Sequence, residues 1–392
     1  MMPAVSQIMR NTQPRRPNGN QARIDSQTQL LAKRTMSREK EARGRPTWMD
    51  TESYYPALDG LRGIAVLMVV YGHAGYWGWV PLLVGCATIG VVLFFFLSGF
   101  LMGHHYTPDA AAASFDRPTL RYWSAFLFRR FLRVYPPYLL APIVGYILLM
   151  TALPPDFEHS KPFSDLHIVD EISRIAFFDG ELGIYWTIKE ELRFYLLYPL
   201  GFLLFSVLGR RVLAVFLIVV ALMAVNHFAR VGADWPGYVA IFAAGVFTSH
   251  VVGMQLEVPA FARHANMIAS GSLLAFAILV FVISRASPTQ HTIWQLDWLF
   301  ALLFLVLFAS LLRSDGALRK ALSWRISVLI GRMSFSLYLV HIIGFHLTRK
   351  YLGWSPNMMI AACIVLAALT LVYYLAVERW FVLLSKRISV RT

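Results

Sequence analysis

Charged residues and cysteine are both scarce in this chain. Only 15% of its 392 residues are Asp, Glu, Lys or Arg, whereas an average soluble domain has about 25%. The two cysteines, Cys86 and Cys363, lie in apolar stretches, which is typical of small core residues rather than of a disulfide or a metal site. We therefore expect neither a disulfide framework nor a bound metal.

Other common features are missing as well. Residues 1–50 contain no apolar run of the kind that a signal peptide needs, so we expect no cleavable leader. No internal repeat is evident, and the longest predicted outer loop, residues 154–185, is too short for an independent catalytic domain. Any catalytic site is therefore expected within the apolar segments.

Apolar sequence is abundant instead. The chain is 57% hydrophobic, and runs long enough to cross a bilayer recur along most of it. These runs predict an all-α, polytopic, multi-pass integral membrane protein of about ten transmembrane helices. The predicted spans are about 61–80, 82–102, 138–153, 186–208, 212–228, 237–252, 266–284, 295–312, 328–347 and 357–376.

The distribution of charge predicts the orientation of these spans. The net charge of +14 is explained by the cytoplasmic excess of Lys and Arg in membrane proteins, so we expect no nucleic-acid partner. Nearly every basic cluster then lies inside, the acidic loop 154–185 lies outside, and both termini are cytoplasmic. Arg349 and Lys350 are the exception, on an outer loop.

Three regions are predicted along the chain. Residues 1–53 are read as a disordered, basic cytoplasmic extension that touches anionic lipid or is inert. Residues 54–381 form the transmembrane domain, and residues 382–392 form a short basic cytoplasmic tail.

The first predicted span carries two groups that are costly in lipid. Asp59 is a plausible N-cap, and Arg62 lies in the first turn, where a cation opposes the helix dipole. His73 follows eleven positions later, about 16 Å along the helix axis. The alternatives are a snorkelling arginine and a packed histidine bonded to the backbone.

Two further clusters follow from the predicted topology. His73, Glu191 and His341 fall at a similar depth in the outer half of the membrane, either by chance or because they face a shared cavity. On the inner side, Arg130 and Arg133 lie one turn apart on the same helix face, and Pro136 and Pro137 are expected to break or redirect that helix.

Arg62 enters at the same inner face as Arg130 and Arg133. Three guanidinium groups there suit phosphate recognition, although ordinary cytoplasmic positive charge is the alternative. A coenzyme A thioester would connect the two clusters, with its nucleotide in the cytoplasm and its pantetheine arm in the helix bundle. The alternative from another class is a secondary transporter of an anionic substrate with His73 and Glu191 as a proton relay.

Several segments together resemble the signatures of the acyltransferase-3 family of membrane acyltransferases, which includes O-acetylases of surface polysaccharides. The resemblance covers about Tyr54 to Phe381 in the right order. It rests on Leu58–Ile64 with Gly72 and His73, Gly90–Met102, Arg130 to Pro136, Trp186–Tyr195, Met333–His341 and, more weakly, Val377–Trp380. Three positions depart from the family pattern: Val92 replaces an acidic residue, Thr187 a serine and Trp380 a proline.

The resemblance implies an O-acyltransferase that transfers groups other than aminoacyl groups. Acyl-CoA, with acetyl as the expected acyl group, would be the donor substrate, and no cofactor would be permanently bound. The acceptor would be a hydroxyl of a cell-surface glycan, its lipid-linked precursor or a related glycoside. The protein would lie among the lipids of the cell (inner or plasma) membrane.

The resemblance also assigns roles to residues. Arg62, Arg130 and Arg133 would bind the donor, and His73 would act as general base, with a covalent acyl-histidine step as a variant. Glu191 would orient the His73 ring. The remaining candidates are Asp59, Tyr195, Ser336 and His341.

Overall fold

The computed structural model describes residues 54–105, 120–150, 184–208, 218, 221, 235–253, 259–286, 293, 296–353 and 358–388. The chain divides into two compact units, Met1–Tyr54 and Tyr55–Thr392, and the description below concerns the second. The predicted extension 1–53, nearly all of the acidic loop 154–185 and most of the fifth span lie outside the described residues.

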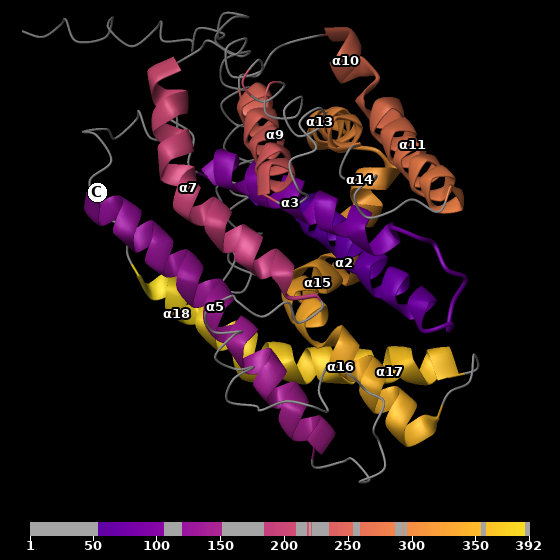
Figure 1. Ribbon diagram of the computed structural model, residues 1–392. Coiled ribbons are helices and arrows are strands. Elements are labelled where there is room, and N and C mark those ends of the chain that lie inside the picture. Colours follow the sequence, from indigo (N-terminus) through magenta and orange to yellow (C-terminus); the bar gives the residue numbers. More distant parts are fainter. Residues whose placement is uncertain are drawn as a thin grey trace, which may run out of the picture. The chain divides into compact units, whose positions relative to one another are not determined.

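Every regular element of these described residues is a helix, so the all-α prediction is confirmed for them (Figure 1). The longer helices are α2 (Pro56–Tyr76), α3 (Cys86–His105), α5 (Leu120–Met150), α7 (Trp186–Leu208), α9 (Trp235–Gly253), α11 (Ala265–Arg285), α13 (Asp297–Arg313), α16 (Ser334–Leu352) and α17 (Met359–Tyr373). The shorter ones are α10 (Pro259–Arg263), α14 (Ala317–Leu322), α15 (Arg325–Arg332), the π-helix η2 (Tyr374–Glu378) and α18 (Arg379–Arg387).

Four of these stretches are long and apolar enough to cross a membrane: Pro56–Tyr76, Cys86–His104, Ala265–Arg285 and Met359–Arg387. A fifth results if α15 and α16, which meet at a bend of 70°, form one broken span. Two shorter apolar helices, Tyr238–Val252 and Trp298–Arg313, add to them. The count of about ten spans stays a prediction.

The start of α2 differs from the prediction that Asp59 caps it. The helix begins four residues earlier, at Pro56 instead of Gly60, because Pro56 has a fixed φ that suits the first helical position. Tyr55 is the N-cap and makes no side-chain capping bond, whereas Asp59 lies in the first turn. Arg62 is therefore in the second turn, where the dipole of the helix end opposes its charge less.

The sequence predicted that the prolines of α5 would break or redirect that helix, and the structure shows that they do not break it. The helix runs without interruption through Pro136, Pro137 and Pro142. Contacts from α16, η2 and α18 hold this segment, and the Tyr373 hydroxyl donates a hydrogen bond to the Pro137 carbonyl. Neighbouring helices thus compensate for the lost backbone hydrogen bonds, as they do in membrane bundles.

The predicted ninth span, 328–347, is two helices rather than one. Met333 both ends α15 and begins α16. Gly331 packs directly on the backbone of Asp59, so that a β-carbon there would collide with it. This close approach holds α15 against the beginning of α2, while α16 turns away along the bundle.

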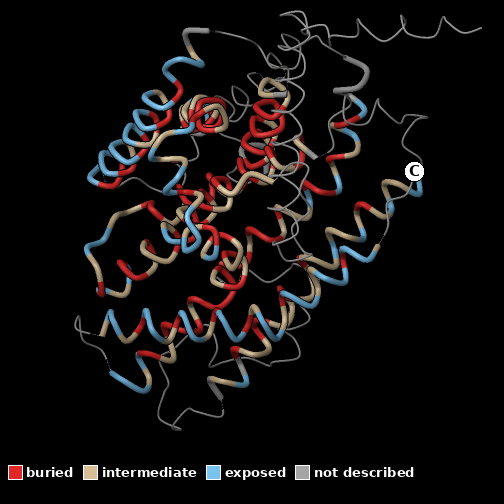
Figure 2. The backbone as a smooth tube through the Cα atoms, turned by 180° about the vertical axis from the view of Figure 1, so that it is seen from behind, coloured by how far each residue is buried: buried red, intermediate tan, exposed pale blue. Residues whose placement is uncertain are grey.

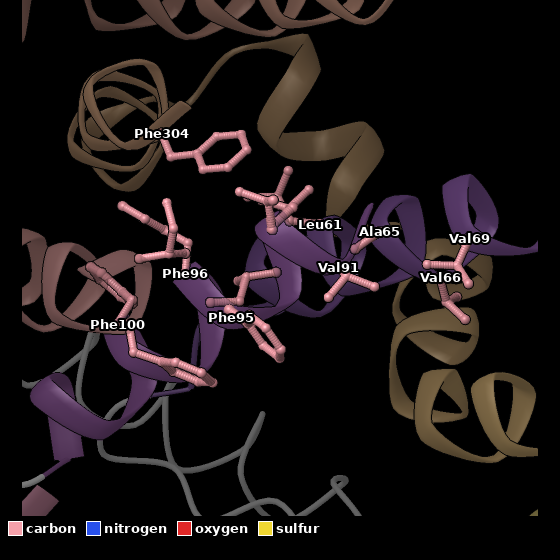
Figure 3. Packing of buried hydrophobic residues seen from close by; sticks show 14 of the residues in the cluster. Leu61, Ala65, Val66, Val69, Val91, Phe95, Phe96, Phe100 and Phe304 are labelled. Atoms are coloured by element: carbon pink, nitrogen blue, oxygen red, sulfur yellow. The ribbon is translucent and has the colours of Figure 1, made fainter. Parts of the chain in front are cut away.

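The hydrophobic core joins α2, α3, α9 and α13. Figure 3 shows Phe96 and Phe100 of α3 in this cluster, together with Phe304 of α13 and Leu61 of α2. The ring centroids of Phe96 and Phe304 are 5.3 Å apart. Close backbone contact supports the packing, since a β-carbon on Gly90 would lie 2.8 Å from the Ala65 carbonyl oxygen.

Several helices expose apolar side chains on their outward faces. Figure 2 shows the exposed turns of α11 and α17. Phe281 on α11 is 58% exposed, Leu196 on α7 67% and Ile360 on α17 70%. In water such surfaces would promote aggregation, whereas lipid chains accommodate them.

Candidate active site

One cavity of about 110 Å³ brings together residues that are far apart in the sequence. Its walls come from α2, α3, α5, α7 and α16. It is lined by Arg62, Val91, Phe94, Phe95, Ser98, Leu101, Arg130, Arg133, Val134, Thr187, Ile188, Glu191, Tyr195, Ser334, Phe335 and Tyr338.

The cavity has an excess of positive charge. Arg62 reaches it from α2, and Arg130 and Arg133 reach it from α5. The guanidinium carbon of Arg130 lies 5.4 Å from the centre of the Tyr195 ring, a cation–π contact that orients it. Three guanidinium groups in a partly desolvated cavity suit a polyanion, because each presents a planar pair of donors to phosphate or carboxylate oxygens.

Glu191 is the one carboxylate among the residues that line this cavity. It accepts a hydrogen bond of 3.3 Å from the Ser98 hydroxyl and a second one from the Tyr195 hydroxyl. Glu191 was predicted to lie beside His73 in the outer half of the membrane. The structure places it with the arginines instead, and its hydrogen-bond partners in the described part of the chain come from α3 and α7.

The N-terminal end of α7 is fastened to α16. The Tyr185 hydroxyl donates to the Leu339 carbonyl at 2.9 Å, and the hydroxyls of Thr187 and Tyr338 are 2.7 Å apart. Thr187 and Tyr338 also line the cavity, so these bonds fix the wall that carries Glu191.

His73 is paired with His341. The Nε2 atom of His341 is 3.2 Å from Nδ1 of His73, and the ring centroids are 5.0 Å apart. His341 is fully buried, whereas His73 is half-buried. Of the three residues that the sequence placed at one depth, the structure thus brings His73 and His341 into contact.

The backbone defines the tautomers of both rings. Nδ1 of His73 is 2.8 Å from the Val69 carbonyl, and Nδ1 of His341 is 2.7 Å from the Tyr338 carbonyl. Because a carbonyl only accepts, both Nδ1 atoms carry the hydrogen in the neutral rings. Nε2 of His73 is then an unprotonated acceptor without a partner in the described residues, as a general base requires.

Ser336 leads to a residue that the motif analysis left out. Its backbone N–H donates to Glu378 Oε2 at 3.0 Å, and its hydroxyl donates to the same oxygen. Glu378 is 4% exposed and ends the π-helix η2, a rare distortion that is frequent at functional sites. The sequence did contain a signal for Glu378, since it is an acidic residue inside an apolar span. The family match at Val377–Trp380 was too weak to make it a candidate.

Asp59 is not among the lining residues of the cavity. Its carboxylate is 3.5 Å from Arg332 Nε, so it joins α2 to the end of α15. Of the sequence candidates, the structure therefore collects Arg62, Arg130, Arg133, Glu191 and Tyr195 in the cavity. It pairs His73 with His341, and it places Ser336 on Glu378 and Asp59 on Arg332.

Comparison with known proteins agrees with these motifs. A sequence model of the acyltransferase-3 family, described as an acyltransferase domain, matches residues 55–377. The chain belongs to this family. As a member with several long apolar helices, it is an integral membrane protein. The match contains all nine sequence candidates and ends one residue before Glu378.

The chain is also similar to a curated protein over a shorter stretch. The chain is 34% identical over 123 residues to "Protein 2 in picA locus" of Rhizobium radiobacter, which is 31% of this chain and 58% of that protein. The chain thus spans 58% of the length of this curated relative. No solved structure matches the chain.

Proposed function

We propose that this acyltransferase-3 member is a multi-pass O-acyltransferase. It transfers an acyl group, acetyl in the first instance, from cytoplasmic acyl-CoA to a hydroxyl of a cell-surface glycan, its lipid-linked precursor or a related glycoside. In this proposal about ten helices cross the cell membrane and both termini are cytoplasmic.

The observation that carries the proposal is the arginine cavity. Arg62 comes from one helix and Arg130 and Arg133 from another, yet all three line one small space. Three fixed cations outnumber the two carboxylates near them, Glu191 in the cavity and Glu378, which interacts with Arg62 and Arg133, and they match the phosphates of a nucleotide-containing donor. Phe94, Phe95 and Leu101 line the same space and suit the less polar arm of that donor.

The histidine pair supports the chemical step. Nε2 of His73 takes the proton of the acceptor hydroxyl as that oxygen bonds to the thioester carbonyl carbon. The tetrahedral intermediate then collapses, the carbon–sulfur bond breaks, and the proton passes to the sulfur of the departing coenzyme A. His341 shares the Nδ1 hydrogen of His73 and keeps the ring in the required tautomer.

Cavity and base are connected through Tyr338. This residue lines the cavity, and its ring centroid is 5.9 Å from that of His341. A donor whose phosphates lie on the arginines would extend along α16 toward His73.

The test uses the full chain purified in detergent with radiolabelled acetyl-CoA. We expect release of free coenzyme A, with label appearing in a glycan or glycolipid fraction when one is supplied. The His73→Ala variant is the background control. Thiol release no faster than that background would contradict an acyltransferase, and donor-independent uptake of a labelled anion into vesicles would favour the transporter.

A further inference from the structure

A second group of residues lies at the end of α2 that follows His73. The turn after the helix contains Trp77 and Trp79, and Gly78 between them has φ of 72°, which a side chain would strain. This turn lets both indoles pack on α16, where Phe345, His346 and Arg349 lie. We name Trp77, Trp79, Phe345, His346 and Arg349 the Trp77 cluster.

The rings of the cluster are in direct contact. The centroid of Trp77 is 5.5 Å from that of Trp79, 5.8 Å from that of Phe345 and 4.8 Å from that of His346. Trp79 and Phe345 meet edge to face at 5.0 Å. The guanidinium of Arg349 lies 5.8 Å from the centre of the Trp77 ring. An aromatic surface and a cation thus meet at one place.

The Trp77 cluster continues into the histidine pair. Phe345 contacts His341 at 5.9 Å between ring centroids, and His341 contacts His73. The backbone N–H of Trp77 donates to the His73 carbonyl at 3.2 Å, so the indole follows the base by one helical turn. A ligand on Trp77 would therefore lie within the length of a sugar unit of His73.

Two hydrogen-bond donors at this end of the structure lack partners among the described residues. Trp79 is 5% exposed, and its indole N–H has no acceptor. The Lys350 ammonium, next to Arg349, has no hydrogen-bond acceptor either, but it lies 5.1 Å from the centre of the Tyr351 ring. A buried N–H group is normally paired, so the indole of Trp79 points to an oxygen-containing ligand.

The positive charge at this end of α16 also bears on the kind of ligand. Under the proposed topology, Arg349 and Lys350 are the basic pair on the outer side, against the bias of membrane proteins. Under that topology the acyl donor's phosphates lie at the other end of the bundle. At this end Arg349 lies over the Trp77 ring, and a cation beside an aromatic face suits a sugar with an anionic group.

We propose that the Trp77 cluster binds the acceptor and that this acceptor is a sugar carrying a negative charge, as a uronate or as a sugar phosphate. The proposal rests on the proposed function and names its second substrate. The C–H face of the sugar ring packs on Trp77, whose ring face is electrically negative. Arg349 pairs with the carboxylate or phosphate, and the ring hydroxyl nearest His73 becomes the nucleophile.

Direct binding tests the site without any reaction. Methyl glucuronide, glucosyl phosphate and methyl glucoside are each titrated onto the full chain in detergent and followed by saturation-transfer NMR. We expect at least one charged probe to bind about 10-fold more tightly than the neutral one, the usual effect of a bond to a charged group. Preference for the glucuronide identifies a uronate, and preference for the phosphate identifies a sugar phosphate.

Variants separate the two contacts. Arg349→Gln should abolish the advantage of the charged probe and leave methyl glucoside unchanged. Trp77→Ala should weaken all three probes by about 10-fold, and Trp77→Phe should restore most of the binding because it keeps an aromatic face. Equal binding of charged and neutral probes to the parent protein would overturn the proposal, as would unchanged binding in the Arg349 and Trp77 variants.

Matched controls exclude a mere interfacial role. Tyr76 is adjacent to Trp77 and 63% exposed, but it is not part of the cluster, and Arg325 is an exposed arginine elsewhere. Tyr76→Ala and Arg325→Gln should bind all probes like the parent. If Tyr76→Ala weakens binding as much as Trp77→Ala, the indole is only a membrane anchor and the proposal fails.

Release of coenzyme A from acetyl-CoA distinguishes this proposal from the proposed function. In Trp77→Ala and Arg349→Gln, the KM for the sugar probe should rise about 10-fold, while release of coenzyme A at saturating probe changes less. If both variants still release coenzyme A and keep the parent's KM for the sugar, the proposed acceptor site is wrong and the proposed acyltransferase function is not affected. If a sugar binds specifically but no coenzyme A is released from acetyl-CoA, the sugar site is supported and the proposed acyltransferase function is wrong.

Discussion

Single residues carry the proposed chemistry, and His73 carries most of it. Its ring is held by Val69 and His341 so that Nε2 is the acceptor atom. We expect His73→Ala to lower acyl transfer by roughly 10²–10⁴, the usual contribution of general acid–base catalysis. Protein yield and donor binding should stay close to the parent, as measured by expression level and acyl-CoA titration. A rate within a few-fold of the parent would exclude this role.

The arginines should act on binding rather than on the chemical step. Arg130→Ala or Arg133→Ala removes a charged hydrogen-bond donor from the cavity, so donor KM should rise about 10- to 100-fold. Saturating donor should recover much of the rate, because phosphate contacts are shared by ground state and transition state. Arg129→Ala is the matched control, since Arg129 is the neighbour of Arg130 and is not among the lining residues. Unchanged donor KM would mean that the donor enters elsewhere.

Asp315, in the exposed loop between α13 and α14, gives a pH dependence outside the spans. A hydrogen bond of 2.8 Å from Asn266 lowers the pKa of the Asp315 carboxyl, and Lys320 and Arg319 add to the effect. A carboxyl whose pKa is lower in the folded state than in the unfolded state stabilises the protein above the unfolded pKa. This stabilisation is lost as the pH falls through the folded pKa. Asp315→Asn should therefore lower Tm at neutral pH, and its deficit should shrink below about pH 4. A deficit that is the same at both pH values would contradict this linkage.

At the scale of elements, the bend between α15 and α16 depends on one close approach. Gly331→Ala forces a methyl group against the Asp59 backbone, and overpacking of this kind typically costs about 1–3 kcal/mol. We expect a lower Tm in detergent. Gly271→Ala is the matched control, because nothing lies within 4 Å of its β-carbon position on α11. Equal Tm values for the two variants would show that α15 does not need this contact.

At the scale of the whole molecule, the orientation is a prediction from the distribution of Lys and Arg. A cysteine at Asp165 should react with an impermeant thiol reagent in intact cells, and a cysteine at Ser323 should not. The parent for this experiment lacks Cys86 and Cys363, because Cys363 is exposed on α17 and would add background. The reverse labelling pattern would invert the bundle and place the arginine cavity on the outer side.

Local sequence patterns predict the helical class and several helix positions correctly, because an apolar run depends only on neighbouring residues. The span predicted at 186–208 has the bounds of α7, and the span predicted at 266–284 differs from α11 by one residue at each end. The family motifs also located the candidate residues. Polar groups inside apolar runs are visible without any knowledge of packing.

Which of these residues meet depends on tertiary packing. Glu191 lies with the arginines and His73 lies beside His341 because the rotation and tilt of each helix select its partners. The hydrophobic period of a single helix does not specify that rotation and tilt. Pro136 and Pro137 stay helical, and α16 bends away at Met333, because contacts from other helices outweigh the local backbone preference. The contact of Glu378 with Ser336 on α16 likewise required the tertiary structure, because the two residues are 42 positions apart in the sequence.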